Sequence, residues 1–240
     1  MIKPRISVVI PTYNEEKNIQ RLLFKLNHQT IPRENYEIII VDGGSTDKTC
    51  DIAKKMGAKV IFQRHKGIGG ARNDGFLIAK ADFVATTDAD CIVPNQWLEI
   101  FLEDFQDPKV VAITGPDGPI EKNWKSKLVY FFFRCLGQGF TLFHIYGTIG
   151  ANSAFRKSAF LKCGGYKPLP HNDDVELAFR IKKFGKIVYD IRTFVNISVR
   201  RLEQQGYFKV IMKWFKGDLC ILLRKQIKAN AKYEKQSYKF

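Results

Sequence analysis

The sequence has no apolar run that reaches the roughly 18 to 20 residues a helix needs to cross a bilayer. Its first five residues lead directly into an apolar, strand-like segment, so we expect no signal peptide. These features predict a cytoplasmic protein whose contact with any membrane is peripheral. The apolar content of 45% is that of an ordinary globular domain, and 240 residues are enough for a substantial core.

Cysteine motifs and phosphate loops are also missing. The five cysteines are scattered and never spaced as Cys-x-x-Cys, which argues against a disulfide framework and against a zinc site. A reducing compartment suits such a chain. The pattern G-x-x-x-x-G-K-[ST] does not occur, so a Walker-type phosphate loop is excluded.

Acidic residues are scarce relative to basic ones. The chain has 39 Lys and Arg against 24 Asp and Glu, and its net charge of +15 indicates anionic partners such as nucleic acid, phosphate-bearing ligands or an acidic membrane surface. Residues 200–240 alone hold eleven basic and three acidic residues, a net charge of +8. This basic tail matches no RNP, KH or zinc-finger pattern, so we expect no nucleic-acid partner.

Strand and helix patterns alternate along the first ninety residues. Apolar runs predict buried strands at residues 6–10, 37–41, 59–62 and 82–85. Helices are predicted between them at residues 19–26, 46–56 and 69–80. This order predicts an α/β fold on a mostly parallel sheet with right-handed crossovers. Later segments predict helices at 97–105, 173–184 and 207–224, and strands at 110–114, 150–155, 187–190 and 195–199.

Polar clusters follow three of the predicted strands: residues 11–14, Asp42 and residues 88–90. In parallel sheets, ligands collect beyond the carboxyl ends of the strands. Asp88 and Asp90 are two residues apart, so on an extended backbone their carboxylates would point the same way and could hold a hard divalent cation. The alternative is an acidic turn that caps the next segment.

The glycine-rich segment from Gly67 to Arg72 comes close to a dinucleotide fingerprint, but Arg72 stands at the third glycine position. We interpret this segment as a mobile loop flanked by the positive charges of Arg64, Lys66 and Arg72. An ordinary turn without a ligand is an equal alternative.

Several motifs together resemble the family 2 glycosyltransferases of GT-A fold. They lie at residues 8–16, 41–47, 71–73, 88–90, 150–155 and 173–180, in order and at plausible spacing. The resemblance covers Ile6 to about Arg201. It implies a GT-A domain over residues 1–201, with a nucleotide-binding half (1–93) and an acceptor half (94–201), followed by a basic amphipathic helical tail (202–240).

The resemblance also implies roles for single residues. Asp90, with Asp88, would hold Mg²⁺ or Mn²⁺ against the donor diphosphate. Asp174 aligns with the general base of the family's Glu-Asp pair, and Asp173 replaces the usual Glu. Residues implied to bind the nucleotide-sugar donor are Pro11, Thr12, Tyr13, Glu15, Asp42, Arg72, Asp88, Arg200 and Arg201. The two last arginines could equally reach an anionic lipid acceptor, or form a solvated basic face.

Elementary chemistry agrees with these roles. A bound cation stabilises the charge that develops on a leaving diphosphate. A carboxylate must take the proton of the attacking hydroxyl, and two adjacent acids buried together would raise one pKa toward working pH. One base facing one leaving group suits a single displacement with inversion. Asp173 and Asp174 could also simply cap the helix that they begin.

We therefore expect an inverting, metal-dependent glycosyltransferase. It would move a hexose from a UDP- or GDP-linked donor to a hydroxyl of a lipid-linked sugar, polyprenyl phosphate or polysaccharide. A sugar nucleotidyltransferase should have a Gly-rich, basic loop after its first strand, and this chain has Pro-Thr-Tyr-Asn-Glu-Glu there. The alternatives are a catalytically inactive relative that only binds nucleotide or membrane, and a basic nucleic-acid-binding protein, which the net charge would explain.

Two segments combine Lys and Arg with large apolar residues: Trp124 to Leu136 and Tyr207 to Arg224. Neither is long enough to span a membrane. Their composition predicts helices that lie in the interface of an anionic membrane, on its inner face. The alternative is that their aromatic faces pack on the core or on another subunit of a homo-oligomer.

Overall fold

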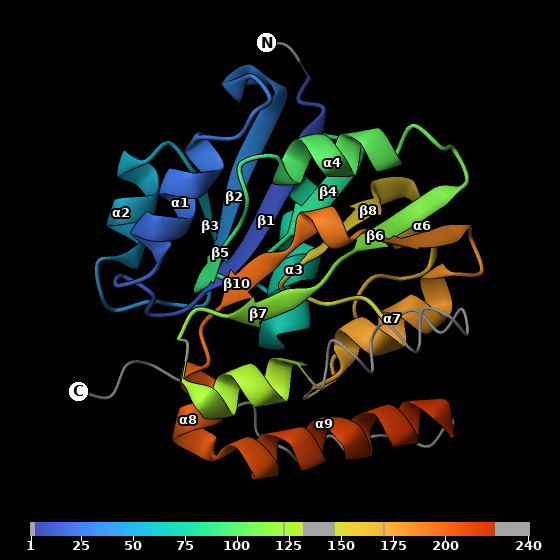
Figure 1. Ribbon diagram of the computed structural model, residues 1–240. Helices are drawn as coiled ribbons and strands as arrows, with labels where there is room; N and C mark the ends of the chain where they lie inside the picture. The colour runs from blue at the N-terminus through green and yellow to red at the C-terminus, as the bar shows by residue number, and fades with distance from the viewer. Residues whose placement is uncertain (1–2, 122, 132–146, 170, 224–240) are drawn as a thin grey trace.

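Strand β1 (Ile6–Thr12) is buried along its whole length because its apolar, largely β-branched run faces helices on both sides of a sheet. The computed structural model describes residues 3–121, 123–131, 147–169 and 171–223. In this part of the chain a seven-stranded sheet has the order β3-β2-β1-β4-β8-β6-β9 (Figure 1). Its other strands are β2 (Tyr36–Asp42), β3 (Lys59–Phe62), β4 (Phe83–Thr86), β6 (Val110–Thr114), β8 (Ser153–Arg156) and β9 (Lys186–Tyr189).

The sheet is mostly parallel. β1 pairs in parallel with β2 and β4, and β2 pairs in parallel with β3, as the alternating pattern predicts. β8 runs antiparallel between β4 and β6, so the whole sheet is mixed. A small second sheet has the order β5-β10-β7 and comprises β5 (Cys91–Ile92), β10 (Val195–Ile197) and β7 (Asp117–Pro119).

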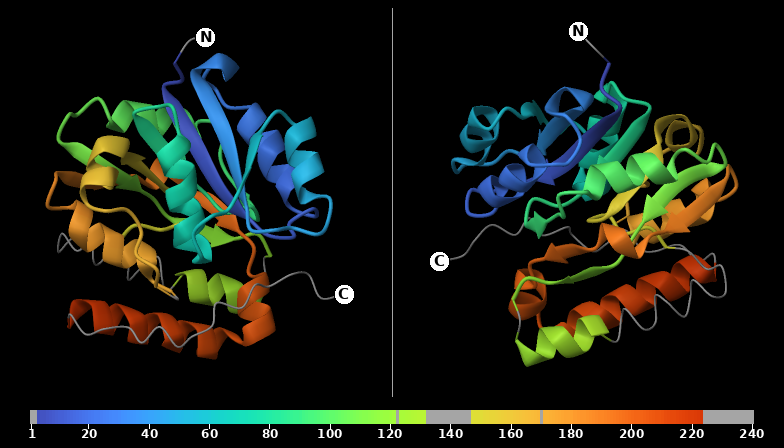
Figure 2. Two further views of the ribbon diagram at one scale, coloured as in Figure 1. Left: turned by 180° about the vertical axis from the view of Figure 1, so that it is seen from behind. Right: turned by 45° about the horizontal axis from the view of Figure 1, so that its top comes forward.

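Helices cover both faces of the large sheet, which gives three layers (Figures 1 and 2). On one face, α1 (Ile19–Asn27), α2 (Thr49–Lys55) and α4 (Trp97–Asp104) pack on alternate strand residues such as Val8 and Ile10. On the other face, α3 (Gly67–Ile78), α6 (Lys157–Lys162) and α7 (Asp173–Ile181) pack on Val9 and Val41. The two-residue period of a strand thus separates two cores. Two 3₁₀ turns, η1 (Arg33–Asn35) and η2 (Ile191–Thr193), complete these layers.

The last helices lie together below the carboxyl ends of β1 and β2 (Figure 1). They are α8 (Arg200–Gln205) and α9 (Tyr207–Leu222), with a further helix at residues 124–131 beside them. Val199, Leu202 and Val210 form their buried cluster, which Tyr130 and Trp214 pack against. Among the described residues no helix has both the length and the apolar character that spanning a bilayer requires. Residues 132–136 and Arg224, the remainder of the two predicted interfacial segments, lie outside the described residues, as do residues 225–240 of the predicted tail.

The structure corrects the interpretation of Gly67 to Arg72. This segment is the first part of helix α3, not a mobile loop. Its glycines permit close packing: a Cβ on Gly70 would lie 2.5 Å from the carbonyl oxygen of His65, and one on Gly69 would lie 2.4 Å from Asp173 Oδ2. Glycine content alone therefore does not distinguish a flexible turn from a tightly packed helix start.

Four short elements were not expected from the sequence: β5, β7, α6 and α8. They contain two to six residues, which is too few for apolar periodicity to register. Two of them, β5 and α8, position the candidate site.

Candidate functional site

The site begins where β1 and β2 end side by side. Thr12 and Asp42 are paired in the register of these strands, and both are buried. The Asp42 carboxylate accepts hydrogen bonds from the N–H groups of Gly44 and Ser45, each at 2.9 Å, and from the Ser45 hydroxyl at 2.5 Å. The Asp42 side chain therefore stabilises the turn after β2, and the residue lies at the carboxyl ends of β1 and β2.

The segment after β1 is linked to that same turn. Asn14 has a left-handed backbone, with φ at +52°, which Asn tolerates better than most residues. Its N–H donates to Ser45 Oγ at 2.9 Å, and its side-chain oxygen accepts from the Thr46 N–H at 2.8 Å. These bonds fix the stretch from Pro11 to Glu15 against the end of β2. Pro11 and Glu15 are buried there, and Tyr13 is half-buried.

The segment after β4 is a turn. Its backbone closes with a hydrogen bond from the Cys91 N–H to the Asp88 carbonyl at 3.1 Å, and β5 follows directly. Asp88 and Asp90 consequently do not sit on the extended strand end that the sequence suggested. Their carboxylates instead take different partners, an arginine from α3 and an arginine from α8.

Arg72 is the partner of Asp88. It lies on α3, is only 3% exposed and donates from Nη2 to Asp88 Oδ1 at 2.6 Å. A Cβ on Gly150 would lie 2.5 Å from Arg72 Nη1, so only glycine fits against the guanidinium there. Burial by itself would lower the pKa of Arg72, but the charges of Asp88 and other nearby groups outweigh burial and raise it. The side chain is thus a fixed buried cation.

Asp173 and Asp174 begin α7, and their charges help to raise the pKa of this cation. The Gly150 N–H donates to Asp174 Oδ2 at 3.0 Å. Burial raises the pKa of both carboxyls; the charge of Asp174 adds to the effect on Asp173, which reaches about 7 despite Arg72. A carboxyl with that pKa exchanges its proton near neutral pH, as a general base must.

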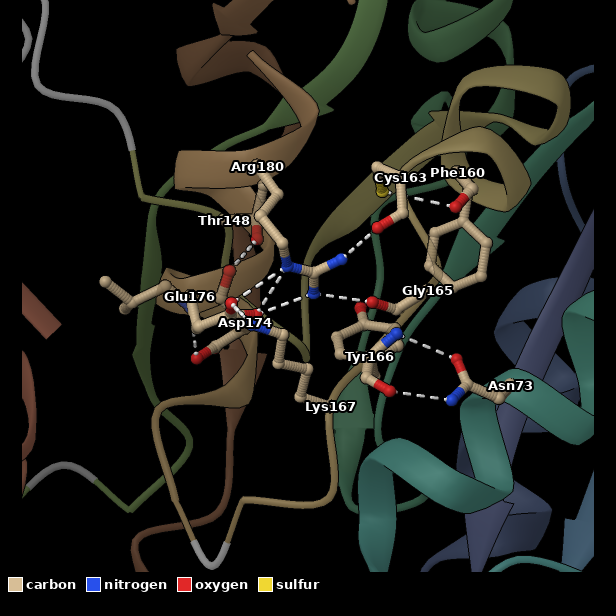
Figure 3. A network of polar contacts seen from close by, with 11 residues as sticks. Asn73, Thr148, Phe160, Cys163, Gly165, Tyr166, Lys167, Asp174, Glu176 and Arg180 are labelled. Carbon is tan, nitrogen blue, oxygen red and sulfur yellow. Dashed lines mark hydrogen bonds and ion pairs between the residues drawn. The ribbon is translucent and has the colours of Figure 1, made fainter. Parts of the chain in front are cut away.

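The loop before α7 is held by a polar network (Figure 3). Glu176 binds Arg180, whose Nη2 donates to the Gly165 carbonyl at 2.6 Å. Asn73 on α3 exchanges two hydrogen bonds with the backbone of Tyr166, at 2.8 and 2.9 Å. The Thr148 hydroxyl donates to the Asp174 carbonyl oxygen at 2.6 Å. Helices α3 and α7 are therefore tied together around the acid pair.

Arg200 is the partner of Asp90. It begins α8, donates from Nη2 to Glu15 Oε1 at 2.6 Å, and lies 3.6 Å from Asp90 Oδ2. Burial raises the pKa of Asp90 to about 7, and the like charges of Asp88 and Glu15 add to this effect. Arg201 is exposed, so the structure brings only the first of the two adjacent arginines into contact with these acids.

The carboxylates of Asp88 and Asp90 are suited to a cation that a bound ligand also coordinates. Among the described residues, no three His, Cys, Asp or Glu side chains are grouped so that they could hold a metal by themselves. Magnesium-type cations are, however, commonly bound by one or two carboxylates together with substrate phosphates. Asp88 and Asp90 offer that donor set, and a cation would relieve the repulsion that raises the pKa of Asp90.

The structure gathers most of the expected residues at one edge of the sheet. One group consists of Arg72, Asp88, Asp173 and Asp174, and a second of Glu15, Asp90 and Arg200. Sequence reasoning missed Tyr166, whose hydroxyl is buried without a hydrogen-bond partner among the described residues, and whose ring lies 5.5 Å from the Arg72 guanidinium. It also missed Gly150 as the packing surface of Arg72. Neither residue has a local sequence signal.

Comparison with known proteins adds an independent observation. The sequence profile of the family described as "Glycosyl transferase family 2" matches residues 7–164. A Bacillus subtilis (strain 168) protein, "Probable glycosyltransferase YdaM", is 28% identical over 243 aligned residues, which cover 92% of this chain and 57% of that protein. A Methanococcus voltae protein, "Dolichyl N-acetyl-alpha-D-glucosaminyl phosphate 3-beta-D-2,3-diacetamido-2,3-dideoxy-beta-D-glucuronosyltransferase", is 33% identical over 135 residues, 51% of this chain and 42% of that protein.

A solved structure shares the fold. It is the mannosyltransferase PcManGT from Pyrobaculum calidifontis in complex with GDP-Man and Mn²⁺, with a TM-score of 0.68 and 23% identity. The match covers 82% of this chain and 58% of that one. The chain thus spans about half the length of the curated relatives that it matches.

Proposed function

The chain belongs to glycosyl transferase family 2, and from this membership we propose that it is an inverting, metal-dependent glycosyltransferase. It moves a hexose from a UDP- or GDP-linked donor to a hydroxyl of a lipid-linked sugar, a polyprenyl phosphate or a polysaccharide. One observation carries the proposal: buried Arg72 is bonded to Asp88, which follows β4, and packs against Gly150, whose N–H is bonded to Asp174 at the start of α7. Asp88, on the side of the donor, and the acid pair, on the side of the acceptor, are thus both close to the fixed positive charge of Arg72.

In this reaction the acid pair removes the proton of the acceptor hydroxyl. The acceptor oxygen forms a bond to the anomeric carbon as the bond to the donor phosphate breaks, and the nucleoside diphosphate leaves with that electron pair. Asp174 takes the proton, and its charge adds to the burial that raises the pKa of the neighbouring Asp173. A single displacement of this kind inverts the anomeric carbon.

Other residues bind the donor. Pro11, Thr12, Tyr13 and Asp42 line the nucleotide side, at the ends of β1 and β2. Arg72 and Arg200 place positive charge beside the phosphates. Asp90 with Asp88 would hold Mg²⁺ or Mn²⁺, and such a bound cation supplies Lewis-acid stabilisation of the leaving diphosphate.

Relatives support this choice of donor, acceptor and cation. PcManGT is described in complex with GDP-Man and Mn²⁺, and the name of the Methanococcus voltae protein gives a dolichyl-phosphate sugar as its acceptor. A catalytically inactive relative would bind the nucleotide sugar but transfer no sugar.

A thermal-shift panel tests the proposal. UDP-, GDP- and dTDP-sugars are added with and without Mn²⁺, and a true donor raises stability as RT ln(1 + [L]/Kd). We expect one sugar nucleotide to stand out, and the Mn²⁺-dependent part of its shift to disappear in Asp90→Asn. The proposal would be refuted if the folded protein showed no thermal shift with any sugar nucleotide. A shift without sugar release in a transfer assay would favour the inactive relative.

We further propose that the enzyme works as a peripheral protein on the cytoplasmic face of an anionic membrane. Four large apolar side chains of α9 and its end are exposed at helical spacing, and three exposed lysines lie beside them: Phe208, Phe215, Leu219 and Leu223, with Lys209, Lys213 and Lys216. The neighbouring helix at 124–131 exposes Trp124, Leu128 and Phe131, again at helical spacing. This arrangement suits a helix pair in the interface plane and a lipid-linked acceptor.

A further inference from the structure

Arg200 occupies a position that a diphosphate-bound cation would also need. Its guanidinium lies within 3.6 Å of Asp90 Oδ2 and makes its shorter contact, 2.6 Å, with Glu15 Oε1. All three side chains are mostly buried, with exposures of 10 to 18%. An ion pair shielded in this way is much less screened by solvent and salt than an exposed one.

A count of charges shows why Asp90 can exchange Arg200 for a divalent cation. Glu15, Asp88 and Asp90 carry three negative charges when ionised, and their contacting arginines, Arg72 and Arg200, carry two positive charges. A divalent cation beside Asp90 would therefore stand next to the Arg200 guanidinium and repel it. A sugar-nucleotide diphosphate carries negative charge that can accept both the cation and the arginine.

We propose that Arg200 competes with the divalent cation for Asp90, and that the donor diphosphate ends the competition by drawing Arg200 onto its phosphate oxygens. This inference rests on the proposed function. It makes Arg200 a device for coupled binding: the cation alone binds weakly, and cation and nucleoside diphosphate bind strongly only together. The two affinities are then coupled, and the coupling is reciprocal.

Calorimetric and EPR titrations of the full chain with Mn²⁺, alone and with UDP or GDP, test this. We expect Arg200→Gln to bind Mn²⁺ alone about tenfold more tightly than wild type, and to lose most of the mutual enhancement between Mn²⁺ and nucleotide. Arg200→Lys keeps the charge but has no planar fork that reaches two carboxylates. Its Mn²⁺ affinity and its coupling should therefore lie between those of wild type and Arg200→Gln. Lys80→Gln removes an exposed positive charge before β4, at the opposite end of that strand from Asp88 and Asp90, and should change Mn²⁺ binding by no more than about twofold.

The outcomes separate this inference from the proposed function. If no sugar nucleotide or nucleoside diphosphate binds the wild type, the proposed function fails, and this inference with it. If wild type binds Mn²⁺ and nucleotide together, and Arg200→Gln leaves Mn²⁺-alone affinity and the coupling unchanged, only the role of Arg200 is overturned. Arg200→Lys decides the question in the same way should Arg200→Gln fail to fold.

Discussion

At the scale of single residues, the site is a set of buried charges that are paired across the sheet edge. Arg72 is held by Asp88 and faces Asp173 and Asp174, and Arg200 is held by Glu15 and Asp90. Ion pairs at such depth are costly to break because removal of one partner leaves an uncompensated charge. Amide substitutions, which keep the shape of the carboxyl, are therefore the informative changes here.

The first prediction concerns the base. Asp174→Asn should lower kcat by about 10²- to 10⁴-fold and leave the Kd for the donor unchanged, because the residue acts on the acceptor hydroxyl. Asp173→Asn should have the smaller effect. Steady-state kinetics and donor titration measure both quantities. A larger loss in Asp173→Asn would move the role of base to Asp173.

The second prediction concerns pH. Burial and the charge of Asp174 raise the pKa of Asp173 to about 7, above its ordinary value of 3.8. A raised carboxyl pKa stabilises the folded state below the unfolded pKa, and this contribution is lost as pH rises through the folded pKa. Asp173→Asn should therefore gain free energy of unfolding relative to wild type, on the order of a few kcal/mol, between about pH 4 and pH 8.

Urea titrations at several pH values measure that difference. Parallel pH profiles for the two proteins would contradict the raised pKa. The same ionisation should appear in catalysis, where kcat of the wild type should rise with pH through neutrality as the acid pair loses its proton.

At the scale of elements, the start of α7 is fastened to α9. Asn172 precedes the acid pair and has a left-handed backbone, with φ at +59°. Its amide donates to the Trp214 carbonyl at 3.1 Å and to Asp218 Oδ1 at 2.5 Å. A Cβ on Gly217 would lie 2.6 Å from Asn172 Oδ1, so the two segments pack in close contact. Helix α9 thereby helps to place Asp173 and Asp174.

The third prediction separates the backbone from the side chain of Asn172. Asn172→Gly keeps the left-handed conformation but loses both bonds to α9, whereas Asn172→Ala loses the bonds and strains the backbone. We expect both variants to lower kcat with little change in donor Kd. We expect Ala to lower the free energy of unfolding by about 1 kcal/mol more than Gly. Full kcat in the glycine variant would show that α9 does not position the acids.

At the scale of the whole molecule, one side carries both the candidate site and the exposed apolar helices. Helix α9 and the helix at 124–131 lie side by side beneath the carboxyl ends of β1 and β2 (Figures 1 and 2). The structure limits the alternative that their aromatic faces pack on the core: Val210 and Trp214 belong to the small buried cluster of these helices, and Phe208 is 77% exposed. For the exposed side chains we propose a membrane surface as the partner, with a second subunit as the alternative.

The fourth prediction tests the membrane proposal. The protein should sediment with phosphatidylcholine vesicles that contain phosphatidylglycerol, and should release at high salt, because each basic residue near the surface contributes on the order of 1 kcal/mol. Phe208→Ser with Phe215→Ser should weaken this binding. Phe24→Ser is the matched control, since Phe24 is also exposed, at 53%, but lies on helix α1, which covers one face of the large sheet.

Indifference to lipid charge and salt would contradict the membrane assignment. Analytical ultracentrifugation without vesicles then distinguishes the homo-oligomer: a dimer that dissociates in the double serine variant would assign the apolar face to a second subunit.

The amino-acid sequence by itself determined the succession of strands and helices in the first half, the polar residues after the strands and the family. Apolar runs and turn residues are local signals, and strands β1 to β4 form where those signals predict them. Pro11, Asp42 and Asp88 follow from the same reasoning, because carboxyl ends of parallel strands meet at one edge.

Only the tertiary structure decided how the charges are paired. Arg200 contacts Glu15 across 185 residues of sequence, Arg72 is buried against Asp88, and Asn172 is fixed by α9. Such contacts depend on which surfaces pack together, and no local periodicity encodes them. For the same reason the antiparallel insertion of β8 and the different partners of Asp88 and Asp90 were visible only once the chain was folded.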